Sequence, residues 1–349
     1  MNKKIKIGNR IVGDNSSVFI IAEMSANHNM DFERAKRIVY EVANTGADAI
    51  KLQTYRPDTI TIDCDKEWFK TQKGLWEGMT LYELYSKAYT PWEWHKELKE
   101  YAESLGLEFF SSPFDLTSID FLEKLNVPAY KVASFEINDI PFIRKIAKTG
   151  KPIIISTGIA YLEDIDLAMR VCKEEGNNNV ILLKCVSAYP TPFEQMNLNV
   201  IPNMKNTFDC LVGLSDHSLG SETAIASVAL GAKVIEKHFT LSREDGGVDS
   251  AFSMEPSEFK NMVNQIRNVE KALGMASFEL TEKQIVSREG SRSLFIVKDM
   301  IEGETFTEEN VKSIRPGIGM HTKYYNDILG KKCRCDLEKG TPMDWKFVE

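Results

Sequence analysis

The sequence has no long hydrophobic run and no apolar leader. No apolar stretch approaches the ~18 to 20 residues that a membrane-spanning helix requires. Residues 1–10 (MNKKIKIGNR) pass from lysine to glycine, asparagine and arginine, whereas a secretion signal would continue into an apolar core. We therefore expect a cytoplasmic protein without a membrane partner.

Cysteines are few and do not follow a framework spacing. The sequence has six, and Cys333 and Cys335 are one residue short of the CxxC spacing of zinc and redox sites. We expect reduced thiols, with neither disulfides nor a structural zinc ion.

An excess of positive charge is also absent. Lys+Arg number 43 and Asp+Glu number 51, which gives a net charge of -8. A general nucleic-acid surface needs a basic face, so we expect no nucleic-acid partner. The chain does have a globular composition, with 43% hydrophobic and 27% charged residues. Its 349 residues suffice for one large domain and a small one.

Eight short apolar runs rich in β-branched residues occur between Val18 and His238. They end at Glu23, Gln53, Ser111, Ser134, Ser156, Cys185, Asp216 and His238. Such runs are typical of parallel strands buried on both faces. Segments with helical periodicity separate them, and residues 90–93 (TPWE) have the sequence of a helix start with a capping box.

Eight strands that alternate with eight helices predict an α/β protein with a (β/α)8 TIM barrel. The alternative is an open doubly wound sheet. That fold usually has a glycine-rich phosphate turn after its first strand, whereas here the strand continues into residues 23–28 (EMSANH).

Two segments depart from this alternation. Residues 56–89 form an aromatic-rich insertion after the second predicted strand, at the end of the barrel where active sites lie. After Gly274, short strands and glycine turns replace the helices. We predict a barrel domain over residues 1–276, a linker over 277–286 and a small β-rich domain over 287–349.

Two histidines lie at the ends of neighbouring predicted strands. His217 follows the seventh strand and His238 ends the eighth, and adjacent strands are about 4.8 Å apart. They could share one divalent metal ion, with water, a substrate oxygen or a carboxylate such as Asp249 or Glu23 completing the coordination. A hard octahedral ion such as Mn²⁺ or Mg²⁺ suits such a site, and the spacing does not choose between them. The competing interpretation is two interior histidines with structural roles.

Two lysines, Lys51 and Lys131, interrupt otherwise apolar strands. A buried ammonium group needs an anionic partner, which could be Glu23 or Glu236 in an internal salt bridge. Hydroxyl groups also gather at the predicted strand ends, at Ser111, Ser112, Ser134, Ser156, Thr157 and Ser215. Lysines with hydroxyls suit a phosphate or carboxylate ligand, so we favour an anionic, phosphorylated substrate.

The motifs at these strand ends resemble those of the sialic acid synthase family, which condenses phosphoenolpyruvate with an amino sugar. The matching segments are residues 21–23, 27–29, 51–54, 111–114, 131–134, 156–158, 189–192, 213–218 and 236–240. The tail, from residues 291–294 to 315–317, resembles the antifreeze-like domain of that family, a β-clip (SAF) module.

The resemblance implies roles for single residues. The set implied to hold phosphoenolpyruvate is Lys51, Lys131, Ser111, Ser112, Ser134, Ser156 and Ser215. The metal on His217 and His238 would polarise the open-chain sugar aldehyde. The implied catalytic set is Glu23 as acid/base, Asp249, Lys51 and Lys131. The implied sugar contacts are Gln53, Ser187, Tyr189, Asp249 and Arg315.

The implied reaction joins carbon 3 of phosphoenolpyruvate to the aldehyde, adds water at carbon 2 and releases phosphate with cleavage of a carbon–oxygen bond. Arg315 would reach from the tail of one subunit into the barrel of the other. The resemblance therefore implies a domain-swapped homodimer.

Within the family, residues 75–78 (LWEG) and 90–94 (TPWEW) are most similar to the branch that forms pseudaminic acid. Ser187 stands where the N-acetylneuraminate synthases have asparagine. The implied acceptor is 2,4-diacetamido-2,4,6-trideoxy-L-altrose, and the product would serve flagellin glycosylation or a surface polysaccharide. An apolar wall for the 6-deoxy carbon could come from the aromatic insertion. N-acetylneuraminate or legionaminic acid synthesis is the alternative.

Two other classes of function remain open at this point. A metal-dependent aldolase could use the same histidines and lysines on the same barrel. A non-catalytic glycan-binding protein could use the tail, although it would not explain lysine and histidine inside barrel strands.

Overall fold

The computed structural model describes residues 3–72 and 76–349 and divides into two compact units, Met1–Gly274 and Met275–Glu349. The division lies two residues before the predicted end of the barrel domain. The predicted linker, 277–286, overlaps helix α11 (Glu282–Arg288). That helix begins there because the Thr281 side chain accepts a hydrogen bond from the Gln284 amide, which forms a capping box.

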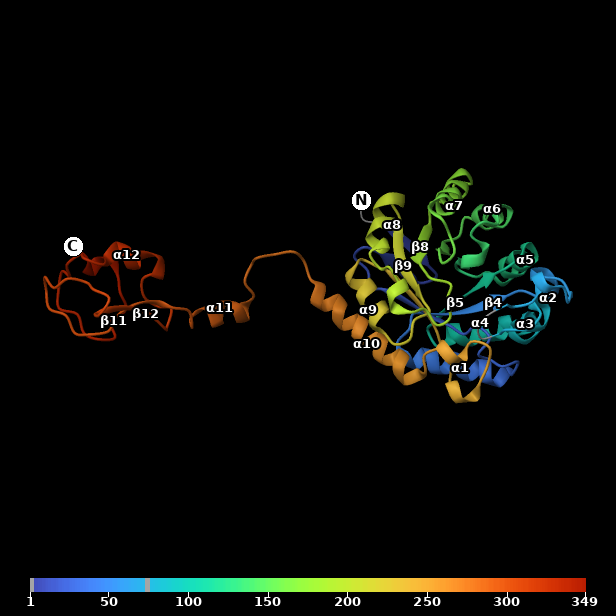
Figure 1. Cartoon of the computed structure of the whole chain (residues 1–349), viewed down its shortest axis with the longest axis horizontal. Helices are drawn as coiled ribbons and strands as arrows, with labels where there is room; N and C mark the ends of the chain where they lie inside the picture. The colour runs from blue at the N-terminus through green and yellow to red at the C-terminus, as the bar shows by residue number, and fades with distance from the viewer. Residues whose placement is uncertain (1–2, 73–75) are drawn as a thin grey trace. The chain divides into compact units, whose positions relative to one another are not determined.

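The first unit is a closed barrel of parallel strands, so the predicted fold is confirmed (Figure 1). Its strands are β3 (Phe19–Glu23), β4 (Ala49–Thr54), β5 (Glu108–Pro113), β6 (Tyr130–Val132), β7 (Ile153–Ser156), β8 (Val180–Lys184), β9 (Leu211–Asp216) and β10 (Val234–His238). The last strand closes the barrel by pairing with the first, with His238 beside Glu23. Because all strands are parallel, their carboxyl ends lie at one end of the barrel.

Helices surround the strands and bury their apolar faces against them. They are α1 (Phe32–Thr45), α4 (His95–Ser104), α5 (Leu116–Leu125), α6 (Ile140–Lys148), α7 (Leu162–Glu174), α8 (Val200–Phe208), α9 (Glu222–Ala229) and α10 (Pro256–Leu273). On α1, for example, Ile38, Val39 and Val42 are fully buried. The same helix begins at the N-cap Asp31 and ends at Gly46, whose φ of 85° is the left-handed conformation that glycine adopts readily.

One predicted helix start is wrong. Residues 92–94 form a short 3-10 helix, η2 (Trp92–Trp94), and α4 begins only at His95. Thr90 is fully buried and its hydroxyl lies 3.4 Å from His28 Nε2, so it contacts a neighbouring loop and does not cap the helix.

The aromatic-rich insertion contains helices as well as loops. Its elements are α2 (Pro57–Ile60), η1 (Glu67–Phe69) and α3 (Leu81–Ala88), and Thr80 caps α3. Of the segment 75–78, Leu75 lies outside the described residues. The sequence did not predict the N-terminal hairpin of β1 (Lys4–Ile7) and β2 (Arg10–Gly13).

Short 3-10 helices follow several of the strands. They are η3 (Ser134–Glu136), η4 (Phe193–Gln195), η5 (Arg243–Asp245) and η6 (Ser250–Phe252). These turns carry several residues of the candidate site described below.

The second unit is β-rich, as predicted, and has a core of its own. Its elements after α11 are β11 (Ser293–Ile296), β12 (Val311–Ile314), η7 (Thr322–Tyr324), α12 (Tyr325–Ile328) and η8 (Trp345–Phe347). Leu294, Ile296, Phe306 and Val311 are fully buried in its core. β11 and β12 pair antiparallel, and isolated bridges join the remaining loops.

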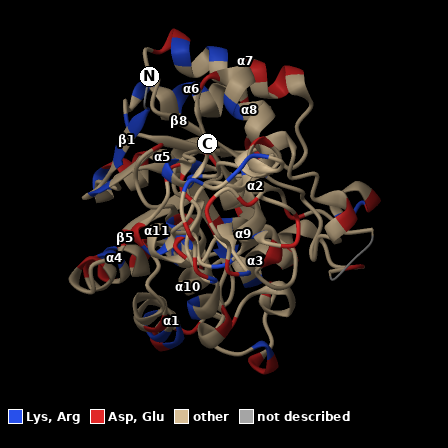
Figure 2. Cartoon of the chain, turned by 90° about the vertical axis from the view of Figure 1, so that its left-hand side faces the viewer, with Lys and Arg blue, Asp and Glu red and all other residues tan. Residues whose placement is uncertain are grey.

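Charged residues of both signs alternate along the outer helices of the barrel (Figure 2). Examples of paired neighbours are Lys99 with Glu103 and Arg170 with Asp166. In the part of the chain that the structure describes, no helix is both long and apolar enough to cross a membrane.

Candidate active site

Polar side chains converge inside the barrel at the carboxyl ends of its strands. Glu23 lies beside Lys51 in the register of β3 and β4, and Gln53 lies beside Ser112 in β4 and β5. Alternate residues of a strand point to the same face, so Gln53 points the same way as Lys51, and His238 points the same way as Glu236. Because Lys51 and Glu236 contact each other inside the barrel, all four side chains face its interior. The predicted site residues on these strands therefore lie in adjoining layers.

Lys51 and Lys131 form the charged half of the site. Lys51 Nζ donates to Ser112 Oγ at 3.0 Å, forms an ion pair with Glu23 and lies 3.5 Å from Glu236 Oε1. Lys131 Nζ donates to Ser156 Oγ at 2.6 Å and lies 3.9 Å from Glu236 Oε1. All of these side chains are buried. The internal salt bridges considered from the sequence are present, and the serine hydroxyls lie next to the same ammonium groups.

Burial and charge act differently on the two carboxylates of this half. Burial raises the pKa of Glu23 despite the nearby Lys51 ammonium group. Burial also acts to raise the pKa of Glu236, but Lys131 and Lys51 outweigh it, so the pKa of Glu236 is lowered. Ser215 Oγ donates to Glu236 Oε1 at 3.2 Å. Glu23 Oε2 is the oxygen that pairs with Lys51, whereas Glu236 Oε2 has no hydrogen bond to any described residue. The two groups thus differ in proton affinity although they share Lys51.

Two predicted phosphoenolpyruvate contacts lie apart from the lysines. Ser111 Oγ is 2.6 Å from Thr54 Oγ1, which in turn is 2.8 Å from His95 Nε2 of α4. Ser111 therefore points out of the barrel, because it precedes the inward-facing Ser112 by one residue. Ser134 lies beyond β6 in η3, where its hydroxyl accepts a hydrogen bond from the Gly158 amide at 3.0 Å.

His217 and His238 form the second half of the site. Their ring centroids are 5.4 Å apart. His217 Nδ1 lies 3.0 Å from the Val186 carbonyl oxygen, so with Nδ1 as the donor its Nε2 carries the lone pair. His238 Nδ1 is buried and has no hydrogen-bond partner among the described residues. Two imidazoles with unused nitrogen atoms fit a shared divalent cation.

The proton affinities of the two histidines differ. Burial and the charge of His217 hold the pKa of His238 well below its ordinary value, so His238 is neutral and able to ligate a metal. Burial would also lower the pKa of His217, but Cys185 and the Val186 carbonyl outweigh it, and the pKa is raised. Within residues 3–72 and 76–349, no group of three His, Cys, Asp or Glu side chains is arranged to hold a metal ion. The structure therefore does not bring Asp249 or Glu23 to the histidines as a third ligand.

Aromatic rings surround the histidine pair. Tyr189 lies 4.4 Å from His217 and Phe252 lies 4.9 Å from His238, measured between ring centroids. Trp76 of the insertion lies 6.1 Å from Tyr189. The loops after β4, β8 and β10 thus meet around the two imidazoles.

Asp249 and Gln53 meet through a residue that the sequence did not indicate. Ser25 Oγ donates to Asp249, and Gln53 Nε2 donates to Ser25 Oγ at 3.0 Å. Burial raises the pKa of Asp249. The carboxyl group and the amide form one polar wall beside Glu23, whose Oε1 accepts a hydrogen bond from the Ser25 amide at 2.9 Å.

Ser187 and Gly158 form a narrow part of the site. A Cβ added at Gly158 would lie 2.3 Å from Ser187 Oγ and 2.7 Å from Ser134 Oγ, so a side chain there would collide with both. Ser187 Oγ is buried and has no hydrogen-bond partner in the described part of the chain. Cys185 Sγ lies 3.8 Å from His217 Nδ1, and His217 lowers the pKa of that thiol to about 7 although burial opposes it.

Sequence reasoning missed the functional interest of Glu136. It is mostly buried in η3, its Oε2 has no partner among the described residues, and burial raises its pKa to about 7. Its position just past the short strand β6 gave no periodic signal. Cys185, Ser25 and Phe252 were missed for the same reason, since all three follow the regular strands.

Arg315 lies in the second unit, directly after β12, and is exposed. The described contacts place it beside no other predicted site residue. Its proposed role depends on assembly with another subunit.

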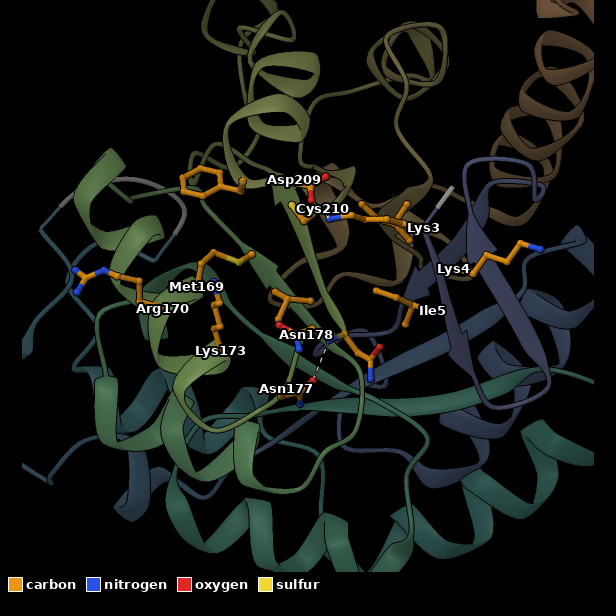
Figure 3. A pocket seen from close by; sticks show the side chains of 14 residues that line it. Lys3, Lys4, Ile5, Met169, Arg170, Lys173, Asn177, Asn178, Asp209 and Cys210 are labelled. Carbon is orange, nitrogen blue, oxygen red and sulfur yellow. Dashed lines mark hydrogen bonds and ion pairs between the residues drawn. The ribbon is translucent and has the colours of Figure 1, made fainter. Parts of the chain in front are cut away.

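A cavity of about 610 Å³ lies at the opposite, amino end of the barrel (Figure 3). Its lining includes Val180 and Leu211, the first residues of β8 and β9, and Lys3, which pairs with Asp209 at 2.8 Å. Among the described residues, none of the buried polar atoms without a partner lies in this lining. The candidate active site is therefore the polar cluster at the carboxyl end.

Comparison with known proteins identifies the family of the chain. The model of the NeuB family matches residues 38–278, and that of the SAF domain matches residues 291–349. The chain is 49% identical to a pseudaminic acid synthase of Campylobacter jejuni, over 97% of this chain and 98% of that protein. It is 45% identical to a pseudaminic acid synthase of Helicobacter pylori, over 95% and 97%.

A solved structure shows the same fold. The N-acetylneuraminic acid (sialic acid) synthetase of Leptospira borgpetersenii, in complex with citrate, is 32% identical and superimposes with a TM-score of 0.73, over 82% of this chain and 95% of that one. The resemblance predicted from the strand-end motifs is confirmed. The chain is an enzyme of the NeuB family with a SAF domain at its end.

Proposed function

We propose that the enzyme is a pseudaminic acid synthase, which condenses phosphoenolpyruvate with 2,4-diacetamido-2,4,6-trideoxy-L-altrose and water to give pseudaminic acid and phosphate. The observation that carries the proposal is the placement of two buried lysines with serine hydroxyls beside two buried histidines, at the active-site end of the barrel. The similarity to pseudaminic acid synthases over nearly the whole chain supports the choice of sugar.

The charged half suits the phosphate and carboxylate of phosphoenolpyruvate. Lys51 and Lys131, with Ser112, Ser156 and Ser215, offer ammonium and hydroxyl donors within one buried volume. Charge-assisted hydrogen bonds of this kind are stronger than neutral ones. In this arrangement the lysines would stabilise the negative charge that develops on the phosphate as it leaves.

His217 and His238 would hold a divalent ion, for which we propose Mn²⁺ before Mg²⁺ or Co²⁺. When bound, the ion supplies Lewis-acid polarisation of the sugar aldehyde. The chain's own contribution is to orient the His217 ring through the Val186 carbonyl and to keep His238 neutral through burial.

Glu23 is the proposed acid/base. Since burial raises its pKa, it can carry a proton and give it to the aldehyde oxygen as carbon 3 forms the new bond. It can then take a proton from the water that adds at carbon 2, and so returns to its starting state. The hydroxyl proton at carbon 2 leaves with the phosphate when the carbon–oxygen bond breaks.

The sugar would lie across the remaining walls of the site. Gln53, Asp249, Ser187 and Tyr189 surround the space next to the histidines, with donors and acceptors for hydroxyl and acetamido groups. Ser187 leaves more room than an asparagine would, which fits an acceptor other than N-acetylmannosamine.

We propose a domain-swapped homodimer in which Arg315 of one subunit completes the site of the other. Large apolar side chains are exposed on the turns and first helical residues after the barrel strands, at Leu116, Phe135, Tyr161, Leu162, Phe193 and Leu219. The second unit and its α11 likewise expose Phe278, Ile285, Val286 and Ile318. Patches of this kind mark association surfaces.

Six free cysteines in the described chain fit the reducing cytoplasm, where we place the reaction. We assign the product to flagellin or surface-polysaccharide glycans.

The deciding experiment measures phosphate release from phosphoenolpyruvate with Mn²⁺ and identifies the products by mass. Three acceptors are offered separately: the altrose-derived diacetamido sugar, its legionaminic counterpart and N-acetylmannosamine. Turnover with the first alone is expected. Preference for another sugar would replace the proposed acceptor, and a reaction that does not depend on phosphoenolpyruvate would point to an aldolase.

A further inference from the structure

Trp76 joins three separate loops at the mouth of the barrel. It belongs to the insertion after β4, its indole Nε1 donates to the Val248 carbonyl oxygen at 3.1 Å, and its ring packs against Tyr189 at 6.1 Å between centroids. Val248 follows β10 and Tyr189 follows β8. The indole is half-buried, so one part of its surface remains open.

The position of Trp76 relative to the histidines defines what it can contact. Tyr189 lies against His217 at 4.4 Å, and Trp76 lies against Tyr189. An open-chain sugar of six carbons whose aldehyde lies at the histidine pair, and which follows this row of rings, would pass Tyr189 and extend toward the indole. The far end of the chain, carbon 6, is the part that Trp76 can meet.

The chemistry of the indole decides which group at carbon 6 is favoured. Its single N–H is already used by the Val248 carbonyl, so its free surface offers no hydrogen bond. A methyl group loses nothing against such a surface, whereas a hydroxyl group must give up its water partners. An apolar pocket discriminates against an added hydroxyl by up to about 100-fold.

We propose that Trp76 is a specificity-determining residue that selects acceptors with a methyl group at carbon 6 over those with a hydroxymethyl group. The inference rests on the proposed function, since it requires the aldehyde to lie at His217 and His238. It adds the residue that recognises the end of the sugar remote from the reacting carbon.

The test compares kcat/KM for two acceptors that differ only in a hydroxyl group at carbon 6, with the wild-type enzyme and with Trp76→Ala and Trp76→Phe. The wild-type enzyme should prefer the 6-deoxy acceptor by about 10- to 100-fold. Trp76→Ala should reduce this preference about 10-fold, mainly by loss of kcat/KM for the 6-deoxy sugar. Trp76→Phe should retain most of it, because an apolar ring remains.

Trp68→Ala is the matched control. Trp68 lies in the same insertion but is 73% exposed, so its loss should leave the ratio unchanged. Equal losses for both acceptors in Trp76→Ala would show a general packing role and overturn the proposal. If Trp76→Ala does not fold, a Trp76→Gln variant with unchanged circular dichroism, which replaces the apolar surface by a polar one, decides the same ratio. An inactive wild-type enzyme with both acceptors would instead refute the proposed function.

Discussion

The two halves of the candidate site differ in how many of their buried polar groups have hydrogen-bond or ion-pair partners within the chain. In the charged half, Lys51 and Lys131 each have a serine hydroxyl and a carboxylate nearby, so the ammonium groups are paired before any ligand binds. In the histidine half, His238 Nδ1 has no partner in the described chain. A buried polar atom without a partner costs free energy. The two ammonium groups are therefore preorganised by the protein, whereas the hydrogen bonding of His238 is left to what binds there.

The largest effect is expected from breaking the histidine half. His238→Ala should lower turnover about 1,000-fold, because Lewis-acid stabilisation of this kind contributes several kcal/mol. The variant should remain folded, since it removes an unpaired group. Phosphate release measures turnover, and calorimetric titration with Mn²⁺ measures binding directly. His321→Ala, in the second unit, is the control. Full activity after chelation would contradict the metal assignment.

Breaking the charged half should cost both activity and stability. Lys51→Met removes the partner of Glu23 and leaves a buried carboxylate, which costs about 3–5 kcal/mol. Denaturant unfolding should show a larger loss at high than at low pH, because burial already raises the pKa of Glu23, the loss of Lys51 raises it further, and protonation removes the unpaired charge. Phosphoenolpyruvate turnover should fall about 100-fold.

A second substitution separates the two effects of Lys51→Met. Lys51→Met combined with Glu23→Gln should recover stability without recovering activity. The exposed Lys96→Met is the surface control. A double variant as unstable as Lys51→Met would show that pairing with Glu23 is not the reason for the loss.

Glu136 is a buried carboxylate that, unlike Glu23 and Glu236, forms no ion pair with Lys51 or Lys131 in the described chain. It therefore tests what burial does to a carboxylate without a paired ammonium group. Its pKa of about 7 in the folded chain exceeds the ordinary 4.5, so the folded state binds the proton more tightly than the unfolded state. Stability is therefore lost as the pH rises from about 4.5 to 7. Glu136→Gln should be up to about 3 kcal/mol more stable than the parent at pH 8 and equal to it at pH 4. The measurement is denaturant unfolding across this range, and parallel pH profiles would refute it.

The smallest expected signal comes from mixing defective subunits. In a swapped dimer of Arg315→Ala with Lys51→Ala, one site has an intact barrel and an intact arginine from the partner. Random mixing makes half of the dimers mixed, so activity should reach about a quarter of the wild-type value. Each variant alone is the control. Verified mixed dimers without activity would exclude the swap.

Much of this arrangement was predictable because strand ends carry the chemistry in this fold. Apolar runs with lysine inside them indicated Lys51 and Lys131, and neighbouring strand ends indicated His217 and His238. The sequence did not show which of Ser111 and Ser112 faces the barrel interior. Adjacent residues of a strand face opposite ways, and two neighbouring serines give no sign of which one points inward. Ser134 lies three residues after Lys131, so its direction depends on the turn η3, which no periodicity predicts.

The remaining misses have local causes. The N-terminal hairpin has strands of only four residues with lysine and arginine on them, too short to show a pattern. Thr90 has the sequence of a helix cap, but tertiary contact with His28 decided its position. The pKa of Glu136 is raised by burial and that of Cys185 is lowered by His217, and both effects depend on tertiary packing.

The pairing of β10 with β3, which sets His238 beside Glu23, has a consequence for biosynthesis of the protein. Glu23, the proposed acid/base, and His238, a proposed metal ligand, are separated by most of the barrel sequence and become neighbours only when the circle of strands is complete. A nascent chain still lacking β10 on the ribosome therefore contains Lys51, Lys131 and their serines, but no working site. We therefore expect chains that end before β10 to be inactive, because they lack His238 and cannot close the barrel.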